Sequence, residues 1–109
     1  MKNFKETVIK ALLPHIILQE TATRPTHGYE LIKQVRTKHG IYLGPSTIYP
    51  ALAELEKQGL ITSTWQQPSP QNDRPRKTYT ITNKGRILLG QTTTVLTFVN
   101  KMLTEVKAW

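Results

Sequence analysis

Residues 46–66 read STIYPALAELEKQGLITSTWQ. The spacing of the apolar side chains in this stretch changes once, at Gly59. Before the glycine, Ile48, Leu52 and Leu55 recur at spacings of four and three, which predicts a helix with these side chains buried. Gly59 is the expected C-terminal stop of this helix. After it, β-branched residues alternate with others, which predicts a strand. A helix that passes directly into a strand is therefore the centre of the fold.

The start of this helix and its outward side supply the first candidate contacts. Ser46 is the expected N-cap, and Pro50 follows closely enough that its missing N–H costs little. The side opposite the buried row is free to meet a partner, and it carries Thr47, Pro50, Ala53, Glu54 and Lys57.

A second strand is predicted after a proline-rich loop. Residues 68–75 hold three prolines, and after them Lys77, Tyr79 and Ile81 occupy alternate positions. This alternation predicts a hairpin whose long tip is basic. Trp65 is expected to pack across the hairpin near Tyr79.

The N-terminal segment has helical periodicity with one interruption. Its apolar stripe predicts an amphipathic helix that faces the core. Pro14 either kinks this helix or starts a second one, because proline removes a backbone donor and clashes one turn back. The residues of the stripe are Phe4, Val8, Ile9, Leu12, Leu13, Ile16 and Ile17.

A further helix is predicted between this segment and residue 46. Thr26 or His27 caps it, Glu30 lies in its first turn, and Gly40 ends it. The side chains expected to face inward are Leu31, Ile32 and Val35.

A final helix is predicted from Asn83 onward. Its apolar stripe, in which leucines repeat every seven residues, is too wide for one packing partner. We therefore expect residues 83–109 to form a dimerisation helix packed on a domain formed by residues 1–82. The expected dimer interface consists of Leu88, Val95, Leu96, Val99, Met102, Leu103 and Val106.

The positive charge of the chain peaks in one short segment, which spans the end of the hairpin and the start of the final helix. The 109 residues suit a single domain and carry a net charge of +8. Residues 74–86 contain five basic residues and no acidic one. Such a concentration favours an element that contacts phosphates over one that only keeps the protein soluble.

Other classes of function find little support. The chain has no cysteine, no apolar run long enough to span a membrane, and no secretory signal at its start, so we expect a cytoplasmic protein associated with the nucleoid. The spacing of His15, His27 and His39 matches no metal-ligand pattern. Glu54 and Glu56 lie on opposite sides of one helix, and no nucleophile and base are paired, so neither catalysis nor a cofactor is expected.

The predicted order of helix, helix, helix, hairpin and helix is that of a winged helix-turn-helix, a mainly α-helical α+β fold, with an added C-terminal helix. In this fold the second helix of the pair enters the major groove and the hairpin, the wing, lies along the DNA backbone. Tyr49 is either a core or capping residue or a DNA contact. The predicted DNA-binding residues are Ser46, Thr47, Tyr49, Pro50 and Lys57 in the recognition helix and Arg74, Arg76 and Lys77 in the wing.

Four segments, in order, resemble the PadR-type transcriptional regulators. Residues 27–31, HGYEL, look like the opening of the family's second helix, and residues 46–52, STIYPAL, look like its recognition helix. Residues 74–79, RPRKTY, are similar to its wing, and residues 82–86, TNKGR, are similar to the start of its last helix.

The resemblance implies a homodimer that binds double-stranded DNA and represses transcription. It also implies dimerisation through the C-terminal helix, commonly with the first helix. In some members repression is released by small aromatic or drug-like effectors. Two other functions fit the same residues: a winged helix used as a protein–protein module, and a non-specific chromatin or RNA-binding protein.

Overall fold

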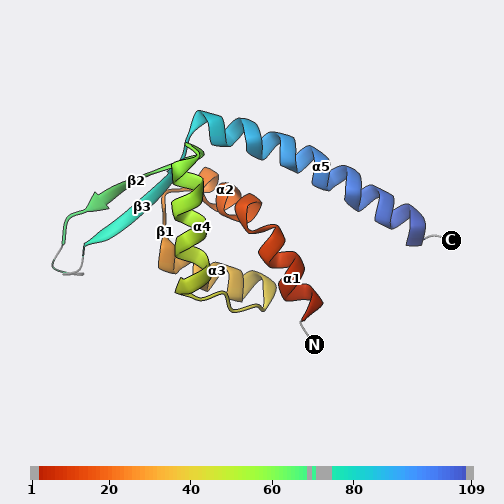
Figure 1. The fold of residues 1–109 in the computed structure, drawn as a ribbon, viewed down its shortest axis with the longest axis horizontal. Coiled ribbons are helices and arrows are strands. Elements are labelled where there is room, and N and C mark those ends of the chain that lie inside the picture. Colours follow the sequence, from red (N-terminus) through yellow and green to blue (C-terminus); the bar gives the residue numbers. More distant parts are fainter. Residues whose placement is uncertain (1–2, 69, 71–74, 108–109) are drawn as a thin grey trace.

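The computed structural model describes residues 3–68, 70 and 75–107, with side chains up to residue 105 (Figure 1). It is a mainly helical α+β fold, as the sequence predicts, with the sheet at one side of the helices. The elements in chain order are α1 (Phe4–Ala11), α2 (Leu13–Thr23), β1 (Thr26–His27), α3 (Gly28–His39), α4 (Pro45–Lys57), β2 (Ile61–Gln66), β3 (Arg76–Ile81) and α5 (Asn83–Lys107).

Pro14 starts a second helix. The chain leaves helical geometry at Leu12, with φ −90° and ψ 2°, and α2 begins at the next residue with Pro14 in its first turn. This break corrects the expectation that the whole N-terminal stripe is core. No residue of α1 is buried, because the break at Leu12 interrupts the stripe; Phe4 is 86% exposed, and Ile9 is half-buried against the core. The buried residues begin at Leu13.

The sheet has three strands, one more than the predicted wing. β3 lies in the middle, paired antiparallel with β1 and with β2. β1 is only two residues long, too short to show a period, and it pairs Thr26 with Tyr79 and His27 with Thr78. His27 is the N-cap residue of α3, but its side chain makes no capping hydrogen bond. The helix ends at Gly40, as expected.

The start of α4 differs from the prediction. The helix begins at Pro45 with Gly44 as its N-cap residue, and no side chain caps it, so Ser46 is not the N-cap. Proline suits the first helical position because the N–H that it lacks has no partner there. The earlier start also places Pro50 inside the helix, beyond the first turn. The helix ends at Lys57, and Gly59 has the positive φ of 76° that few residues other than glycine adopt.

The hairpin forms over the predicted residues. Ile61 pairs with Ile81, and Ser63 pairs with Tyr79. Trp65 pairs with Lys77, so it lies diagonally across from Tyr79 on the same side of the hairpin. The Trp65 side chain is 66% exposed.

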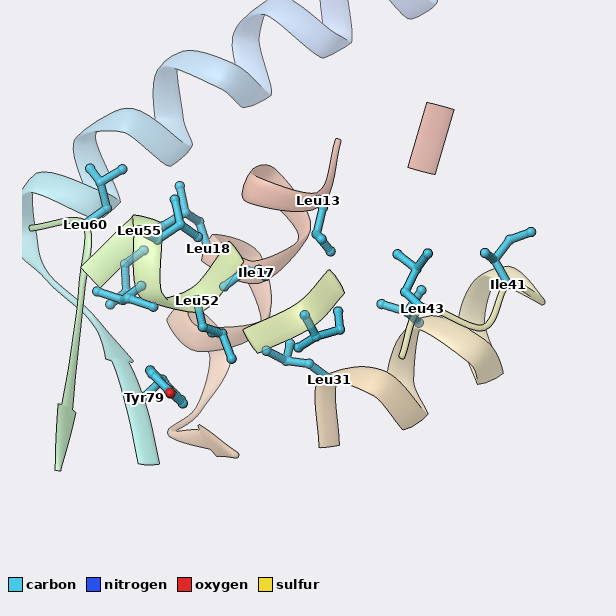
Figure 2. Packing of buried hydrophobic residues seen from close by; sticks show 14 residues of the cluster. Leu13, Ile17, Leu18, Leu31, Ile41, Leu43, Leu52, Leu55, Leu60 and Tyr79 are labelled. Carbon is cyan, nitrogen blue, oxygen red and sulfur yellow. The ribbon is translucent and has the colours of Figure 1, made fainter. Parts of the chain in front are cut away.

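The core lies where α2, α3 and α4 meet the sheet (Figure 2). The predicted row of α4 is buried, as are Leu31 and Val35 of α3, whereas Ile32 is half-buried. Tyr79 and Ile81 close the core from β3. Figure 2 shows Leu18, Leu55 and Leu60 near the first turns of α5. The fully or nearly buried apolar residues are Leu13, Ile17, Leu18, Leu31, Val35, Ile41, Leu43, Ile48, Leu52, Leu55, Leu60, Ile61, Tyr79 and Ile81.

α5 leaves the sheet at a tightly packed point. The Gly85 N–H donates to Thr82 Oγ1 at 3.0 Å, which caps the helix. The Thr82 hydroxyl donates in turn to the Gly59 carbonyl at 2.6 Å. A Cβ on Gly85 would lie 2.1 Å from the carbonyl oxygen of Leu60, so a larger residue does not fit here. The first half of α5 packs on α2, and the helix then extends away from the wing (Figure 1).

Gly85→Ala is therefore expected to lower the free energy of unfolding by about 1–3 kcal/mol, as other overpacked sites do. Gly90→Ala is the matched control, because a Cβ on Gly90 meets no atom within 4 Å. In the interior of the same helix this control should stabilise the protein by about 0.5–1 kcal/mol. Urea unfolding followed by circular dichroism at one protein concentration measures both. Equal effects of the two substitutions would contradict the role assigned to the contact between Gly85 and Leu60.

Candidate nucleic-acid interface

The outward side of α4 is open to solvent. Ile48, Leu52 and Leu55 are buried, and this fixes the rotation of the helix about its axis. The residues on the other side then point away from the core. Of the residues that the sequence assigns to DNA contact, Ser46, Tyr49, Pro50 and Lys57 are exposed and Thr47 is half-buried.

Tyr49 lies on the surface with its ring against the start of α3. It is 43% exposed, so it is neither a core residue nor a helix cap. A Cβ on Gly28 would lie 2.5 Å from Tyr49 Cε1. The absence of a side chain at Gly28 therefore makes the space that the tyrosine ring occupies, and it brings the first turn of α3 next to the outward side of α4.

Lys77 is held between the wing and α4. Its Nζ lies 3.8 Å from Glu56 Oε1 and 5.6 Å from the centre of the Trp65 ring. Glu56 also accepts a hydrogen bond from the Ser63 hydroxyl of β2. The Lys77 ammonium thus joins β3, β2 and the last turns of α4 at a half-exposed site.

Arg76 points to a different neighbour. Its guanidinium carbon lies 5.6 Å from the centre of the Tyr29 ring, at the start of α3. Sequence reasoning did not select Tyr29, although Tyr29 lies beside Gly28 in one of the segments that carry the family resemblance. Arg74, the third predicted wing contact, lies outside the described residues.

These side chains enclose a hollow of about 460 Å³ between α3, α4 and the wing. We call it the wing-root hollow. Tyr29, Tyr49, Trp65 and Tyr79 contribute aromatic rings to its lining, and Arg76 and Lys77 contribute basic groups. It is lined by His27, Gly28, Tyr29, Tyr49, Trp65, Pro75, Arg76, Lys77 and Tyr79.

Tyr79 is the buried tyrosine of this group, with 5% of its surface exposed. Burial raises the pKa of its phenol above 10.0, the ordinary value of tyrosine, because the phenolate would lose its hydration. The negative charges of Glu56 and of ionised Tyr49 raise this pKa further. Tyr79 therefore stays a neutral phenol at any physiological pH.

Two of the three histidines make structural contacts. His15 Nδ1 lies 2.7 Å from Thr92 Oγ1 and joins α2 to α5. His27 Nδ1 lies 3.3 Å from the Lys77 carbonyl oxygen, beside the pairing of β1 with β3. Over the described part of the chain, no three or more histidine, aspartate or glutamate side chains gather into a group that could hold a metal ion.

A helix pair whose second helix is exposed beside a basic hairpin defines a winged helix-turn-helix regulator of transcription. Comparison with known proteins gives the family. Residues 17–91 match the model of the transcriptional regulator PadR-like family, so the chain belongs to this family. Its members are DNA-binding regulators.

Individual relatives agree with this assignment. The chain is 32% identical over 89 residues to the transcriptional regulator Rv3488 of Mycobacterium tuberculosis, an alignment that covers 82% of this chain and 76% of that protein. A PadR-like transcriptional regulator of Bacillus cereus superposes with a TM-score of 0.81 at 26% identity, over 92% of this chain and 95% of the other. A PadR family transcription regulator of Clostridium difficile gives a TM-score of 0.78 at 28% identity, over 86% and 96%.

Among the described residues, none of the helices has the length and apolar character needed to cross a membrane.

The environment of Tyr79 predicts a late phase in the alkaline titration of the four tyrosines. Because its pKa is higher in the folded than in the unfolded chain, the stability due to the neutral phenol is complete below about pH 10. It is lost as the pH rises through the folded pKa. Near-ultraviolet absorbance should show a phase above the ordinary pKa of tyrosine, and Tyr79→Phe should remove that late phase. Tyr42→Phe, at a 61% exposed position, should leave it in place. Simultaneous ionisation of all four tyrosines would contradict this environment.

Proposed function

We propose that this chain is a homodimeric repressor that binds a pseudo-palindromic DNA operator, with α4 in the major groove and the wing on the sugar-phosphate backbone. The observation that carries the proposal is the common face of α4 and the wing. Tyr49 on the outward side of the helix and the wing cations Arg76 and Lys77 line the same wing-root hollow. A duplex that meets α4 on this face also meets the wing.

Base reading is assigned to α4. Ser46, Thr47 and Tyr49 lie near the N-terminal end of the helix, which is the end that contacts base edges in helix-turn-helix proteins. Pro50 and Lys57 extend the same outward side. Hydroxyl and ammonium groups supply the donors and acceptors that distinguish base pairs in the major groove.

Backbone contact is assigned to the wing. Arg76 and Lys77 are the described cations of β3, and Arg74 is added from the sequence. Phosphate contacts of this kind set affinity and position but carry no sequence information. The net charge of +8 supports the same partner, and binding to chromosomal DNA would place the protein at the nucleoid.

Dimerisation is assigned to the far part of α5. Leu88 and Leu89 are half-buried against the core of their own chain, but the apolar side chains that follow are uncovered. Val95 is 59% exposed and Leu103 is 65% exposed. A shallow hollow of about 240 Å³ between α2 and α5, lined in part by Leu96, continues this surface. The uncovered apolar residues of α5 beyond Leu89 are Val95, Phe98, Val99, Met102 and Leu103, and those of α1 are Phe4 and Val8.

A second copy is the occupant that suits this surface. Soluble monomers avoid large apolar patches, and a two-fold pairing of α5 with its counterpart covers both copies at once. The same axis then relates two α4 helices, so the operator should contain half-sites about one helical turn, roughly 34 Å, apart. A dimer on such a site represses by excluding RNA polymerase from the overlapping promoter.

Titration of fluorescently labelled duplexes, one from the region upstream of its own gene and one of random sequence, tests the function. At about 50 mM and about 200 mM salt, a sequence-specific regulator should prefer the native duplex, and its affinity should fall steeply with salt. Equal affinity for both duplexes would indicate a non-specific nucleic-acid-binding protein. Absence of measurable binding at the lower salt would indicate that the chain is a protein–protein interaction module instead.

The two DNA-contacting elements should respond differently to substitution. Thr47→Ala or Lys57→Ala should reduce the preference for the native duplex by about 1 kcal/mol, roughly five-fold, because a base contact is lost. Arg74→Ala combined with Arg76→Ala should weaken binding to both duplexes by the same factor and flatten the salt dependence. If the wing variant changed sequence preference as much as the α4 variants, this division of roles would be wrong.

Val99→Asp should separate the two chains. A carboxylate in an apolar interface without a partner costs several kcal/mol, so the variant should sediment as a monomer and lose tight binding to the native duplex. Thr97→Asp is the matched control. It adds the same charge, but Thr97 is exposed on the opposite side of α5. Analytical ultracentrifugation and circular dichroism measure assembly and folding. If the wild-type protein were a monomer at tens of micromolar, α5 would not be a dimerisation helix.

A further inference from the structure

The two described cations of the wing have different surroundings. Lys77 is paired with Glu56 and lies over Trp65. Within the described ranges, no carboxylate lies at ion-pair distance from Arg76, whose guanidinium lies over the Tyr29 ring instead. Adjacent strand residues point to opposite faces of the hairpin, and this accounts for the two directions. The positive charge of Arg76 is thus left for an external anion.

The Tyr29 ring restricts the position of the Arg76 guanidinium. At 5.6 Å the cation is attracted to the face of the tyrosine ring. A planar guanidinium over a ring face directs its N–H groups outward along its own plane, where they can reach two oxygens of one phosphate. Tyr29 is 54% exposed and lies in the first turn of α3, whose position relative to β3 is set by the pairing of β1 with β3.

We infer that Tyr29 is a positioning residue that holds Arg76 at the rim of the wing-root hollow to bind one phosphodiester group of the DNA strand that passes between α4 and the wing. The inference rests on the proposed function and adds a residue to its interface. The aromatic walls beside Arg76, from Tyr29 and Tyr49, match the apolar face of a deoxyribose next to that phosphate. The ligand of the wing-root hollow is therefore a segment of sugar-phosphate backbone, independent of sequence.

A double-mutant cycle on a labelled duplex of random sequence tests the positioning role. Tyr29→Leu keeps an apolar side chain but removes the ring face, and it should weaken binding by about two- to five-fold for each wing in contact. Tyr29→Phe keeps the ring face and should bind like the wild type. In an Arg76→Ala background, Tyr29→Leu should cause no further loss, because the group that the ring positions is absent.

Two controls separate this effect from unfolding and from loss of charge. Equal thermal midpoints by circular dichroism show that Tyr29→Leu remains folded. Lys101→Ala removes one exposed charge from α5, away from the wing, and should change affinity less than Arg76→Ala (Figure 1).

Three outcomes would overturn the inference. Tyr29→Leu and Tyr29→Phe with equal affinity would show that the ring face has no role, and additive losses in the cycle would show that Tyr29 acts without Arg76. In both cases wild-type binding to the duplex keeps the proposed function intact. Wild-type protein with no measurable duplex binding at about 50 mM salt would end both the proposed function and the inference.

Discussion

β3 is hydrogen-bonded on both edges, and the positions of the other functional elements follow from that pairing. On one edge it pairs with the two residues that immediately precede α3, and on the other it pairs with the strand that leaves α4. One residue after β3 ends, α5 begins. Backbone hydrogen bonds are short and directional, so both helices of the DNA-binding pair and the wing are held in one frame. A free two-stranded hairpin would lack the first of these connections.

The wing-root hollow is a consequence of that frame. Because β1 holds the start of α3 against β3, the Tyr29 ring comes within reach of Arg76, and the missing side chain at Gly28 lets Tyr49 of α4 fill the remaining side. Lys77 and Glu56 tie the other face of the hairpin to the end of α4. Each contact is modest by itself, since exposed ion pairs and cation–π contacts contribute about 1 kcal/mol or less. Together they restrict the wing to one side of α4.

α5 is anchored to the same core and extends to the far end of the molecule, whose longest dimension is 59 Å. Gly85 allows its first turn to lie against the Leu60 carbonyl, and the bond between His15 and Thr92 holds its middle against α2. Beyond that point its apolar side chains are uncovered. A helix anchored at one end and paired at the other is a rigid spacer, so the distance between two α4 helices in the proposed dimer depends on where α5 is anchored.

Periodicity along the chain was sufficient to predict α3, α4, β2, β3 and α5, because each has a repeating face that burial must satisfy. The same information predicted the buried rows of α4, the stop at Gly59 and the basic wing. It could not reveal β1, whose two residues have no period, nor that no residue of α1 is buried, because the direction of a helix after a break depends on what it packs against. The partners of Arg76, Lys77 and Tyr49 were likewise decided by tertiary structure alone. They join residues that are distant along the chain, and only the pairing of β1 and β2 with β3 brings those residues together.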